Sequence, residues 1–205
     1  MTEIKAVLFD VDGVVIRGRH KYFSDRLSQE HGIPLEEIMP FFKNEYGLCA
    51  IGQADLKQVL PPYFKRWGWT KSTEDFMDYW FQGEKDLDQQ VLGVVDKLRT
   101  AGLLTGLATD NERYRAQFLL DVLKVGEHFD KTYVSAHIGH KKPNPEFFSF
   151  VLEDLQLPPS KILYWDDDIK NVTGAQTLGI QAKHYQDFPS FQQEMERLSL
   201  LPNGR

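Results

Sequence analysis

The sequence is poor in cysteine, since Cys49 is the single one among 205 residues. One cysteine excludes an intramolecular disulfide, so apolar packing must hold the fold, and a reducing compartment is the simplest setting. No apolar run approaches the roughly 20 residues that a membrane-spanning helix needs. Near the start, Glu3, Lys5 and Asp10 interrupt the apolar stretch that a secretory signal would require. These absences predict a cytoplasmic protein.

Positive charge is also scarce. The 24 Lys and Arg residues are outnumbered by 30 Asp and Glu residues, which gives a formal net charge of −6. Nucleic-acid-binding domains carry a basic patch, and anionic membrane surfaces attract basic segments. We therefore expect neither a nucleic-acid nor a membrane partner. The sequence shows no internal repeats and no low-complexity segments, and it leaves the oligomeric state open.

What the sequence does contain is an alternation of short apolar runs and amphipathic helical segments. The apolar runs predict strands at residues 4–9, 103–108, 133–134, 162–165 and 180–185. The segments between and after them predict helices at residues 88–101, 112–123, 146–155, 172–178 and 191–198. Strands that alternate with helices form a parallel sheet, so we expect an α/β fold with a Rossmann-like parallel sheet and helices on both faces.

Residues 17–85 depart from this rhythm, because they show helical periodicity and no convincing strand. Helices are expected at residues 22–31, 35–44, 55–67 and 72–81. Pro61-Pro62 predicts a kink or break in the third helix, Ser72 opens the fourth with a capping signature, and residues 46–54 predict a loop. We expect residues 17–85 to form a small all-helical cap domain, inserted into a core domain made of residues 1–16 and 86–205.

Two carboxylates follow the first predicted strand, in the sequence Phe9-Asp10-Val11-Asp12-Gly13-Val14. Gly13 breaks the strand and lets the chain turn. Asp10 and Asp12 are then expected at the carboxyl edge of the sheet, where open α/β folds bind their ligands. Taken alone, this string fits an ordinary turn or a calcium loop as well as a catalytic site.

Three more polar clusters lie where later strands end or a helix begins. They are Ala108-Thr109-Asp110-Asn111, Lys141-Lys142-Pro143 and Asp166-Asp167-Asp168. A parallel sheet brings these loops to the edge that carries Asp10 and Asp12, so carboxylates, a hydroxyl and an ammonium group meet there. Carboxylates at this density cannot all ionise without a cation, and Mg²⁺ prefers such oxygen ligands. A lysine and a metal ion beside an aspartate suit a phosphoryl group, whose charge they neutralise.

In this order, and with a helical block between the first and second, the four clusters resemble the motifs of the haloacid dehalogenase (HAD) superfamily of hydrolases, over residues 4–185. The resemblance implies a phosphatase-like member with a helical cap inserted after the first strand. It implies that Asp10 is the nucleophile and Asp12 the general acid and base. It also implies that Thr109 hydrogen-bonds the phosphoryl group and that Lys142 orients the nucleophile.

The resemblance further implies Mg²⁺ as the cofactor. Its expected ligands are Asp10, the carbonyl of Asp12, Asp167 as the main acidic ligand and the neighbouring Asp166, with Asn171 supporting them. Such a set of oxygen atoms is what a hard divalent cation requires.

Three residues are candidates for substrate binding, namely Asp110, Asn111 and Arg17. Relatives usually carry Asn where Asp110 stands. Either the register is shifted by one residue, or Asp110 points outward and a backbone N–H acts in its place. Arg17 fits a substrate anion and a surface position equally well. Lys141 is a weaker match than its neighbour for the catalytic lysine, and Asp168 favours an N-cap over a metal ligand.

Asp12 favours phosphoryl transfer over dehalogenation, because an alkoxide leaving group needs a proton and a halide does not. We therefore predict a magnesium-dependent phosphatase that acts on a small phosphorylated metabolite, a sugar phosphate or nucleotide-like phosphomonoester, through an aspartyl-phosphate. Two alternatives stay open: a phosphomutase of the beta-phosphoglucomutase type, and a non-catalytic interaction protein on the same fold. The second would be expected to lack a core residue, yet the chain has Asp10, Asp12, Thr109, Lys142 and Asp167.

Overall fold

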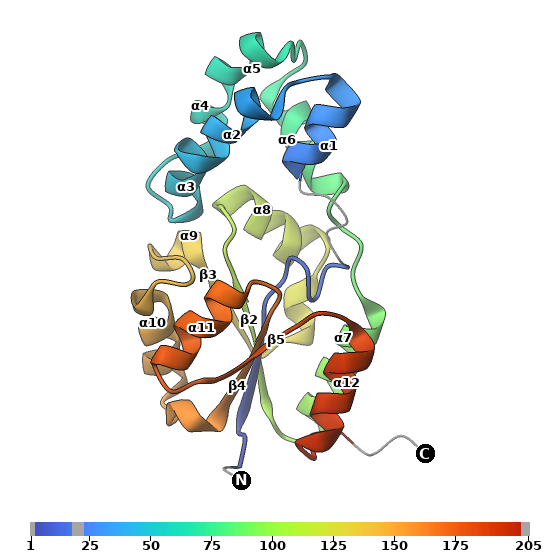
Figure 1. The fold of residues 1–205 in the computed structure, drawn as a ribbon, viewed down its shortest axis with the longest axis vertical. Coiled ribbons are helices and arrows are strands. Elements are labelled where there is room, and N and C mark those ends of the chain that lie inside the picture. The colour runs from blue at the N-terminus through green and yellow to red at the C-terminus, as the bar shows by residue number, and fades with distance from the viewer. Residues whose placement is uncertain (1–2, 18–22, 202–205) are drawn as a thin grey trace.

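A computed structural model describes residues 3–17 and 23–201 of the protein (Figure 1). Five parallel strands form one sheet in the order β3-β2-β1-β4-β5. They are β1 (Ala6–Phe9), β2 (Leu104–Thr109), β3 (Lys131–Val134), β4 (Ile162–Asp166) and β5 (Gln181–His184). The central strand β1 pairs with both neighbours, with Ala6 opposite Leu104 of β2 and Ile162 of β4. The parallel α/β sheet expected from the sequence is confirmed.

The sheet buries apolar side chains on both faces, because successive residues of a strand point to opposite sides. Val7 and Phe9 of β1 belong to a cluster formed with α7 (Gln89–Thr100) and α12 (Phe188–Arg197). Ala6 and Leu8 belong to a second cluster, formed with α10 (Pro145–Leu155) and α11 (Ile169–Thr177). Figure 1 shows these two helix pairs on opposite sides of the sheet, which confirms the expected layers.

The connection from β2 to β3 differs from the single helix predicted at residues 112–123. It consists of α8 (Arg113–Gln117), the π-helix η1 (Phe118–Val122) and the 3₁₀-helix η2 (Val125–His128). A short helix, α9 (Ser135–Ile138), follows β3, and a 3₁₀ turn, η3 (Pro159–Lys161), precedes β4; neither is evident from the sequence. Four residues are too few for a recognisable helical period, which explains why α9 was missed.

Helices α1 to α6 form a separate layer above the carboxyl edge of the sheet (Figure 1). They are α1 (Phe23–His31), α2 (Leu35–Lys43), α3 (Glu45–Ala50), α4 (Leu56–Val59), α5 (Pro61–Trp67) and α6 (Thr73–Gln82). Their buried side chains make a cluster of their own, in which Phe41 and Phe76 are fully buried. The chain therefore has a helical cap, as expected. Tyr22, where the first cap helix was predicted to begin, lies outside the described residues.

Two local signals in the cap are confirmed and one prediction is wrong. Pro61 starts α5 after α4 has ended, so the chain breaks at the proline pair. Ser72 and Asp75 form a reciprocal capping box at the start of α6. The loop predicted at residues 46–54 is wrong for its first part, because α3 runs to Ala50. Gly47 costs a helix about 1 kcal/mol, which the burial of Cys49 and Ala50 can offset.

The two chain segments that join the cap to the sheet run side by side. The Arg17 amide donates to the Asp86 carbonyl at 2.8 Å, and the Asp88 amide donates to the Val15 carbonyl at 2.8 Å. Before the chain leaves the sheet layer for the cap, Gly13 turns it with φ at 96°, a value that favours glycine. The turn that follows β1 is thus tied to the segment that returns from α6.

The cap also touches the sheet layer directly beside the strand ends. The Ser135 hydroxyl at the start of α9 donates to the carbonyl of Ala50, at the end of α3, at 2.6 Å. Gly52 lies so close to α9 that a Cβ there would be 2.4 Å from the Ala136 carbonyl oxygen. Among the described residues, no helix combines the length and apolar character that crossing a bilayer requires.

Candidate active site

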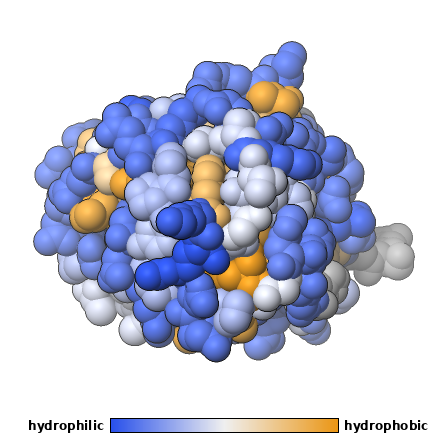
Figure 2. Space-filling model, turned by 90° about the horizontal axis from the view of Figure 1, so that it is seen from above, coloured by the Kyte–Doolittle hydropathy of each residue, from blue (hydrophilic) through white to orange (hydrophobic). Residues whose placement is uncertain are grey.

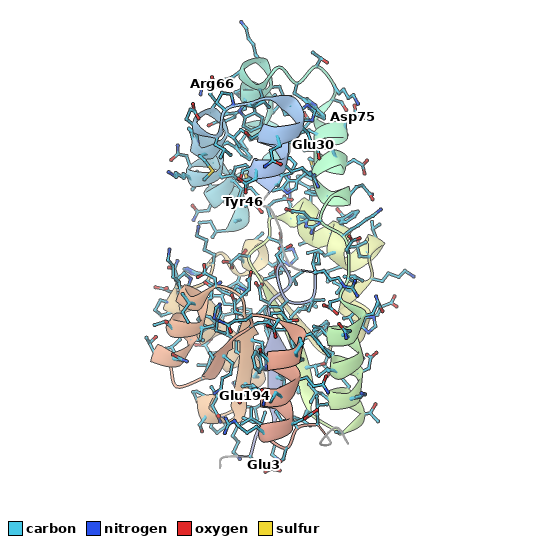
Figure 3. The ribbon with its side chains drawn as sticks, turned by 45° about the vertical axis from the view of Figure 1, so that its right-hand side comes forward. Glu3, Glu30, Tyr46, Arg66, Asp75 and Glu194 are labelled. Carbon is cyan, nitrogen blue, oxygen red and sulfur yellow. The ribbon has the colours of Figure 1, made fainter. Side chains whose placement is uncertain are left out.

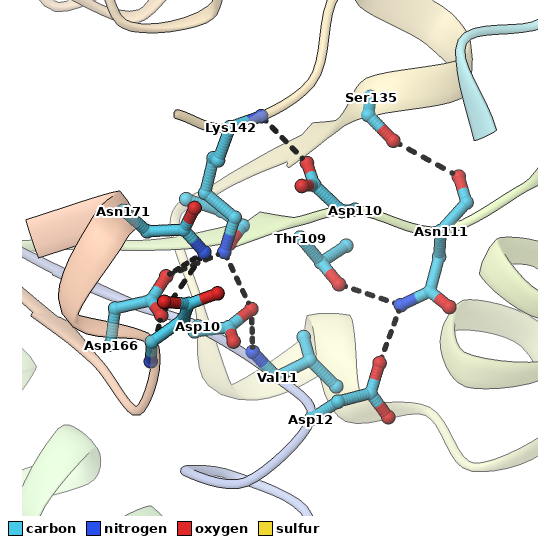
Figure 4. Close-up of polar contacts among 12 residues, drawn as sticks. Asp10, Val11, Asp12, Thr109, Asp110, Asn111, Ser135, Lys142, Asp166 and Asn171 are labelled. Atoms are coloured by element: carbon cyan, nitrogen blue, oxygen red, sulfur yellow. Dashed lines mark hydrogen bonds and ion pairs between the residues drawn. The ribbon is translucent and has the colours of Figure 1, made fainter. Parts of the chain in front are cut away.

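The floor of the site forms where three neighbouring strands end (Figure 4). Asp10 directly follows β1, Thr109 ends β2 and Asp166 ends β4. Because these strands are adjacent and parallel, their carboxyl ends meet at one edge of the sheet. Lys142 reaches the same place from the loop between α9 and α10. The structure thus brings together residues that the sequence spreads over more than half of the chain.

Lys142 is a buried cation between two carboxylates. Its Nζ lies 2.8 Å from Asp10 Oδ1 and 2.8 Å from Asp166 Oδ2, and its side chain is only 1% exposed. Burial alone would lower the pKa of Lys142, but Asp10, Tyr164 and Asp166 raise that pKa well above its usual value. The group therefore stays an ammonium ion at neutral pH.

Asp10 is positioned by contacts on its own carboxylate. Oδ1 accepts a hydrogen bond from the backbone N–H of Val11 at 2.7 Å, besides its contact with Lys142. Burial raises the pKa of Asp10 well above its usual range, and the Lys142 ammonium opposes that rise. The lysine therefore favours the ionised carboxylate, which is the form that can act as a nucleophile.

Asp166 is fully buried and its carboxylate is surrounded by donors. It accepts hydrogen bonds from the Asp168 amide at 2.7 Å, from Asn171 Nδ2 at 3.1 and 3.2 Å, and from the Tyr164 hydroxyl. Together with the Lys142 contact, these bonds fix the carboxylate in place. The side chain of Asp168 accepts from the Lys170 amide and caps α11, as the sequence favoured.

Asp12 is held at both carboxylate oxygens by side chains that follow β2. Oδ2 accepts from Asn111 Nδ2 at 2.9 Å, and Arg115 Nη2 lies 3.4 Å from Oδ1. Asn111 Nδ2 also contacts Thr109 Oγ1 at 2.6 Å. A chain of polar contacts thus links Thr109 through Asn111 to Asp12. Of these residues, Asp12, Asn111 and Arg115 line the cavity described below, whereas Thr109 is buried and does not line it.

Sequence reasoning missed Arg115. Its side chain is 3% exposed, and buried arginines are rare unless they are paired. Besides Asp12, it donates to the carbonyl of Phe81 at 3.2 Å and to that of Glu84, where α6 leaves the cap. A guanidinium beside the last carbonyls of a helix is electrostatically favourable. Arg115 therefore connects the sheet layer, the Asp12 carboxylate and the returning cap segment, and nothing in the pattern around it signals that position.

Asp110 does not point outward, contrary to one of the two sequence-based interpretations. It lines the cavity, and its Oδ1 accepts a hydrogen bond from the Lys142 backbone amide at 3.0 Å. Burial raises the pKa of Asp110, while Lys142 opposes the rise. Thr109 remains the last residue of β2, and Asn111 lines the cavity and contacts both Thr109 and Asp12, so the alternative of a register shift by one residue stays open. Asp110 holds the backbone of the loop that carries the buried lysine.

Arg17 and Lys141 lie outside this group. The Arg17 side chain is 60% exposed, and its Nε lies 3.9 Å from Asp88 Oδ2. Its backbone pairs with the returning segment at Asp86, which directs the side chain toward solvent and away from the lining of the cavity. The structure therefore does not bring Arg17 to the site, and the surface alternative holds. Lys141 is exposed, so the buried ammonium belongs to Lys142 alone of this pair.

The acidic residues can hold a metal ion. Asp10, Asp166 and Asp167 each offer a carboxylate oxygen within 4.8 Å of the others. A Cβ at position 13 would lie 2.1 Å from Asp167 Oδ2, so glycine there lets this carboxylate approach the turn after Asp12. The donors are all oxygen atoms, and carboxylates outnumber the nearby cations. This arrangement fits Mg²⁺ or another hard divalent cation.

A cavity of about 710 Å³ opens above this floor. Its volume is in the range of small-molecule sites. The cap supplies its upper wall with apolar and aromatic side chains: Phe23, Leu35, Met39, Phe42, Tyr46 and Trp80. Figure 3 shows Tyr46 at the underside of the cap, toward the sheet. A small molecule can therefore lie between cap and sheet, with an anionic end near Lys142 and Asp10.

Comparison with known proteins decides the family. The family model for haloacid dehalogenase-like hydrolases matches residues 4–179. The chain belongs to this family of hydrolases. The match extends over both parts of the sheet layer and the helical cap between them, which agrees with the resemblance seen in the four motifs.

Similar proteins include a phosphatase of comparable length. Over 186 residues, the chain is 26% identical to a phosphorylated carbohydrates phosphatase of Thermotoga maritima, and this alignment covers 87% of the chain and 83% of the relative. Over 77 residues, it is 33% identical to drimenol cyclase drtB of Aspergillus calidoustus, and that alignment covers 38% of this chain and only 15% of the cyclase. The second match thus concerns a small part of a much longer enzyme.

A solved structure with the same fold comes from Bacteroides thetaiotaomicron. It is a HAD family enzyme in complex with magnesium and inorganic phosphate, with a TM-score of 0.76 and 22% sequence identity. The superposition covers 92% of this chain and 98% of the other. At this identity the likeness shows the fold, with its sheet and its helical cap.

Proposed function

We propose that this HAD-like hydrolase is a magnesium-dependent phosphatase that hydrolyses a small phosphomonoester through an aspartyl-phosphate on Asp10. The observation that carries the proposal is the contact of 2.8 Å between the buried Lys142 Nζ and Asp10 Oδ1, with Asp12 lining the same cavity. The phosphatase name of the Thermotoga maritima relative supports this reaction. A small phosphorylated metabolite is the corresponding substrate, and the sugar phosphate or nucleotide-like ester expected from the sequence is one class to include in its test.

In the first half of the reaction, a carboxylate oxygen of Asp10 attacks phosphorus, and the bond from phosphorus to the alcohol oxygen breaks. The Lys142 ammonium holds Asp10 and neutralises part of the negative charge on the phosphoryl group. Asp12 donates its proton to the leaving alkoxide. The alcohol is then free, and the phosphoryl group is bound to Asp10.

In the second half, a water molecule attacks phosphorus and the bond to Asp10 breaks. Asp12, now ionised, accepts the proton of the water. The contacts from Asn111 Nδ2 and Arg115 Nη2 hold the Asp12 carboxyl group in place for both proton transfers. Inorganic phosphate leaves, and both aspartates return to their starting protonation states.

We propose that Asp10, Asp167 and the backbone carbonyl of Asp12 hold Mg²⁺. When bound, the ion neutralises negative charge on the phosphoryl oxygens. The close approach of Asp167 to the turn at Gly13 supports this set. Asp166 already accepts hydrogen bonds from several donors, which favours a role in fixing Lys142 over direct coordination. Asp110 and Asn171, which line the cavity, and Thr109, which is buried beside Asn111, then support the reacting groups.

We also propose the division into a core domain, residues 1–16 and 86–205, and a cap domain, residues 17–85. The separate apolar cluster of the cap and the two adjacent connecting segments support these boundaries. A cytoplasmic location is consistent with the single, buried Cys49.

The test is a screen of phosphorylated metabolites with and without Mg²⁺, for the chain and for its Asp10→Asn variant. We expect phosphate release that requires the ion, stops on chelation and returns when Mg²⁺ is added. The variant should bind substrate without turnover. Full activity after exhaustive chelation would contradict the metal site, and turnover by Asp10→Asn would contradict the nucleophile. A requirement for a bis-phosphorylated sugar would favour the phosphomutase alternative.

A further inference from the structure

Helix α2 carries a broad apolar face, only part of which is used by the cap interior. Ile38 and Phe41 are fully buried in the interior of the cap. Leu35, Met39 and Phe42 form a stripe along the cavity side of this face, where they line the cavity. Phe42 also packs against the apolar cluster of the cap, whereas Leu35 and Met39 do not belong to that cluster. The apolar surface of Leu35 and Met39 is therefore turned to the site.

Aromatic rings from three other cap helices extend this apolar stripe into a wall. Phe23 and Trp80 stack with ring centroids 4.6 Å apart and an interplanar angle of 9°. Phe42 meets the edge of Trp80 at 5.5 Å, and Tyr46 lies 5.3 Å from the same ring. The Trp80 indole N–H donates to Glu84 Oε2 at 3.0 Å, which fixes the ring. The wall is thus held in one arrangement by mutual ring contacts.

The sheet layer adds an apolar residue on the opposite side. Ile169, in the first turn of α11, is 56% exposed and lines the same cavity. Leu35 is 39% exposed. Among the residues that the structure describes, five large hydrophobic side chains are exposed, and two of them, Leu35 and Ile169, line this cavity. Seen from above, most of the surface is hydrophilic, with small apolar patches between polar side chains (Figure 2). Apolar residues gathered at a hollow mark a binding surface for an apolar group.

We propose that the alcohol part of the substrate is apolar, either a hydrocarbon chain or an aromatic group, and that Leu35, Met39, Phe42 and Trp80 bind it. This inference rests on the phosphatase function proposed above. With the phosphoryl group at Asp10, the rest of the ester extends toward the cap wall.

Burial energetics favour this substrate class over a polyhydroxylated one. An apolar group gains free energy in proportion to the area that it buries against the wall. Each hydroxyl of a sugar chain would need a partner, because burying an unpaired hydroxyl is unfavourable. Among the described cap residues that line the cavity, polar partners are limited to Ser24, Asp25, Glu84 and the Tyr46 hydroxyl.

The first experiment compares esters with similar leaving groups. Hexyl phosphate and phenylethyl phosphate are set against glycerol phosphate and ribitol phosphate, all esters of primary alcohols, in the presence of Mg²⁺. We expect kcat/KM for the apolar esters to be higher by about tenfold or more, the size of effect that apolar contacts give in binding pockets. Equal or higher values for the polyol esters would overturn the inference. Failure to hydrolyse any ester would overturn the proposed function itself, and this inference with it.

The second experiment assigns the preference to the cap wall. The double variant Leu35→Gln with Met39→Gln should reduce the ratio of apolar to polyol kcat/KM by about tenfold or more. The matched control is Leu48→Gln, because Leu48 is a cap leucine that is 47% exposed and lies outside the cavity lining. Its ratio should equal that of the original chain. Should the double variant not fold, Met39→Gln alone is compared with the control. The same ratio in all the folded variants would overturn the inference.

Discussion

Two kinds of surface meet at the cavity between the sheet and the cap. The floor consists of loops at strand ends, and its buried charges are each fixed by several contacts, as Lys142 is by Asp10 and Asp166. The roof is the cap wall described above. It consists of helices and lines the cavity largely with aromatic and aliphatic side chains, such as Phe42 and Trp80. Polar contacts position the floor, and ring packing positions the roof.

The proposed function accounts for this difference. Phosphoryl transfer needs oriented charges in a water-poor site, where each charge acts strongly. Such charges must be paired when they are buried, which explains the dense contacts around Asp166. Selection of a substrate needs only a complementary surface. The two proposals thus assign the chemistry to the floor and the selectivity to the roof, and substitutions in each layer should have different consequences.

The largest effect is expected from the floor, at Asp10, the proposed nucleophile. Asp10→Asn removes the attacking oxygen while it preserves the shape of the side chain. We expect turnover to fall by at least about 10⁴-fold, as for other nucleophile substitutions, for apolar and polyol esters alike. Phosphate release measures the loss. Mass spectrometry should detect a phosphoryl group on residue 10 of the original chain and none on residue 10 of the variant.

The control for this variant is Asp187→Asn. Asp187 caps α12 by accepting from the Ser190 amide, and asparagine is an equally good cap. It should leave activity unchanged. A loss of activity in the control that matches the loss in Asp10→Asn would mean that the assay reports folding and not chemistry.

Asp12 gives a smaller effect that depends on the leaving group. Asp12→Ala should slow alkyl phosphates by about 10²- to 10⁴-fold, the usual contribution of a general acid. Aryl phosphates should lose much less, because a nitrophenolate leaves without needing a proton. Steady-state kinetics on hexyl phosphate and nitrophenyl phosphate measure the two losses. Similar losses on both esters would mean that Asp12 acts mainly through structure or metal binding.

Lys142→Met tests whether the stability and the turnover of the protein depend on the buried ammonium group of the floor. The variant leaves Asp10 and Asp166 buried without their ammonium partner, which should lower the free energy of unfolding by about 3–5 kcal/mol. Turnover should also fall, because charge neutralisation of the phosphoryl group is lost. Urea unfolding measures the first effect and phosphate release the second. Lys141→Met is the matched control, since Lys141 is the exposed neighbour and should change neither quantity.

The stability of the Lys142→Met variant should depend on pH in a characteristic way. Burial raises the pKa of Asp10, and Lys142 opposes this rise, so removal of the lysine should raise the pKa further. A carboxyl group whose pKa is higher in the folded than in the unfolded state binds more protons when folded, so stability falls as pH increases through the raised pKa. The variant should therefore regain stability toward acidic pH. An unfolding midpoint that is independent of pH would contradict this account.

The floor could be predicted from the sequence and most of the roof could not. Strand ends in a parallel sheet must share an edge, so the positions of Asp10, Thr109 and Asp166 follow once the strands are recognised. The cap shows its helices through periodicity and capping. The apolar residues of α2 look alike in the sequence, so periodicity alone does not tell that Phe41 is fully buried in the cap while Phe42 also lines the cavity.

The residues that sequence reasoning missed or misplaced share a physical cause. Arg115 acts through contacts with a segment far away along the chain, at Phe81 and Glu84, and no local pattern encodes such contacts. Arg17 was a candidate because it follows the first motif closely. Its backbone pairing with the returning segment, which only the folded chain shows, directs its side chain to solvent.

The smallest effect is expected where the two layers touch, at Gly52. This residue has φ at 73°, and a Cβ would lie 2.4 Å from the Ala136 carbonyl oxygen. Gly52→Ala must therefore move the cap turn away from α9. Gly68 is the matched control, since it has φ at 67° and nothing within 4 Å of a Cβ. Gly68→Ala should cost about 1–2 kcal/mol from the left-handed backbone alone, as measured by urea unfolding, and leave activity unchanged.

Gly52→Ala should cost more than this control and should also lower kcat/KM several-fold. The reason is that Ser135, beside the displaced turn, contacts the carbonyls of both Ala50 and Asn111, and Asn111 holds Asp12. A shift of the roof would then reach Asp12, the proposed general acid on the floor, through Ser135 and Asn111. If Gly52→Ala and Gly68→Ala lose the same stability and keep the same kcat/KM, the contact at α9 is incidental, and the two layers of the site work independently of each other.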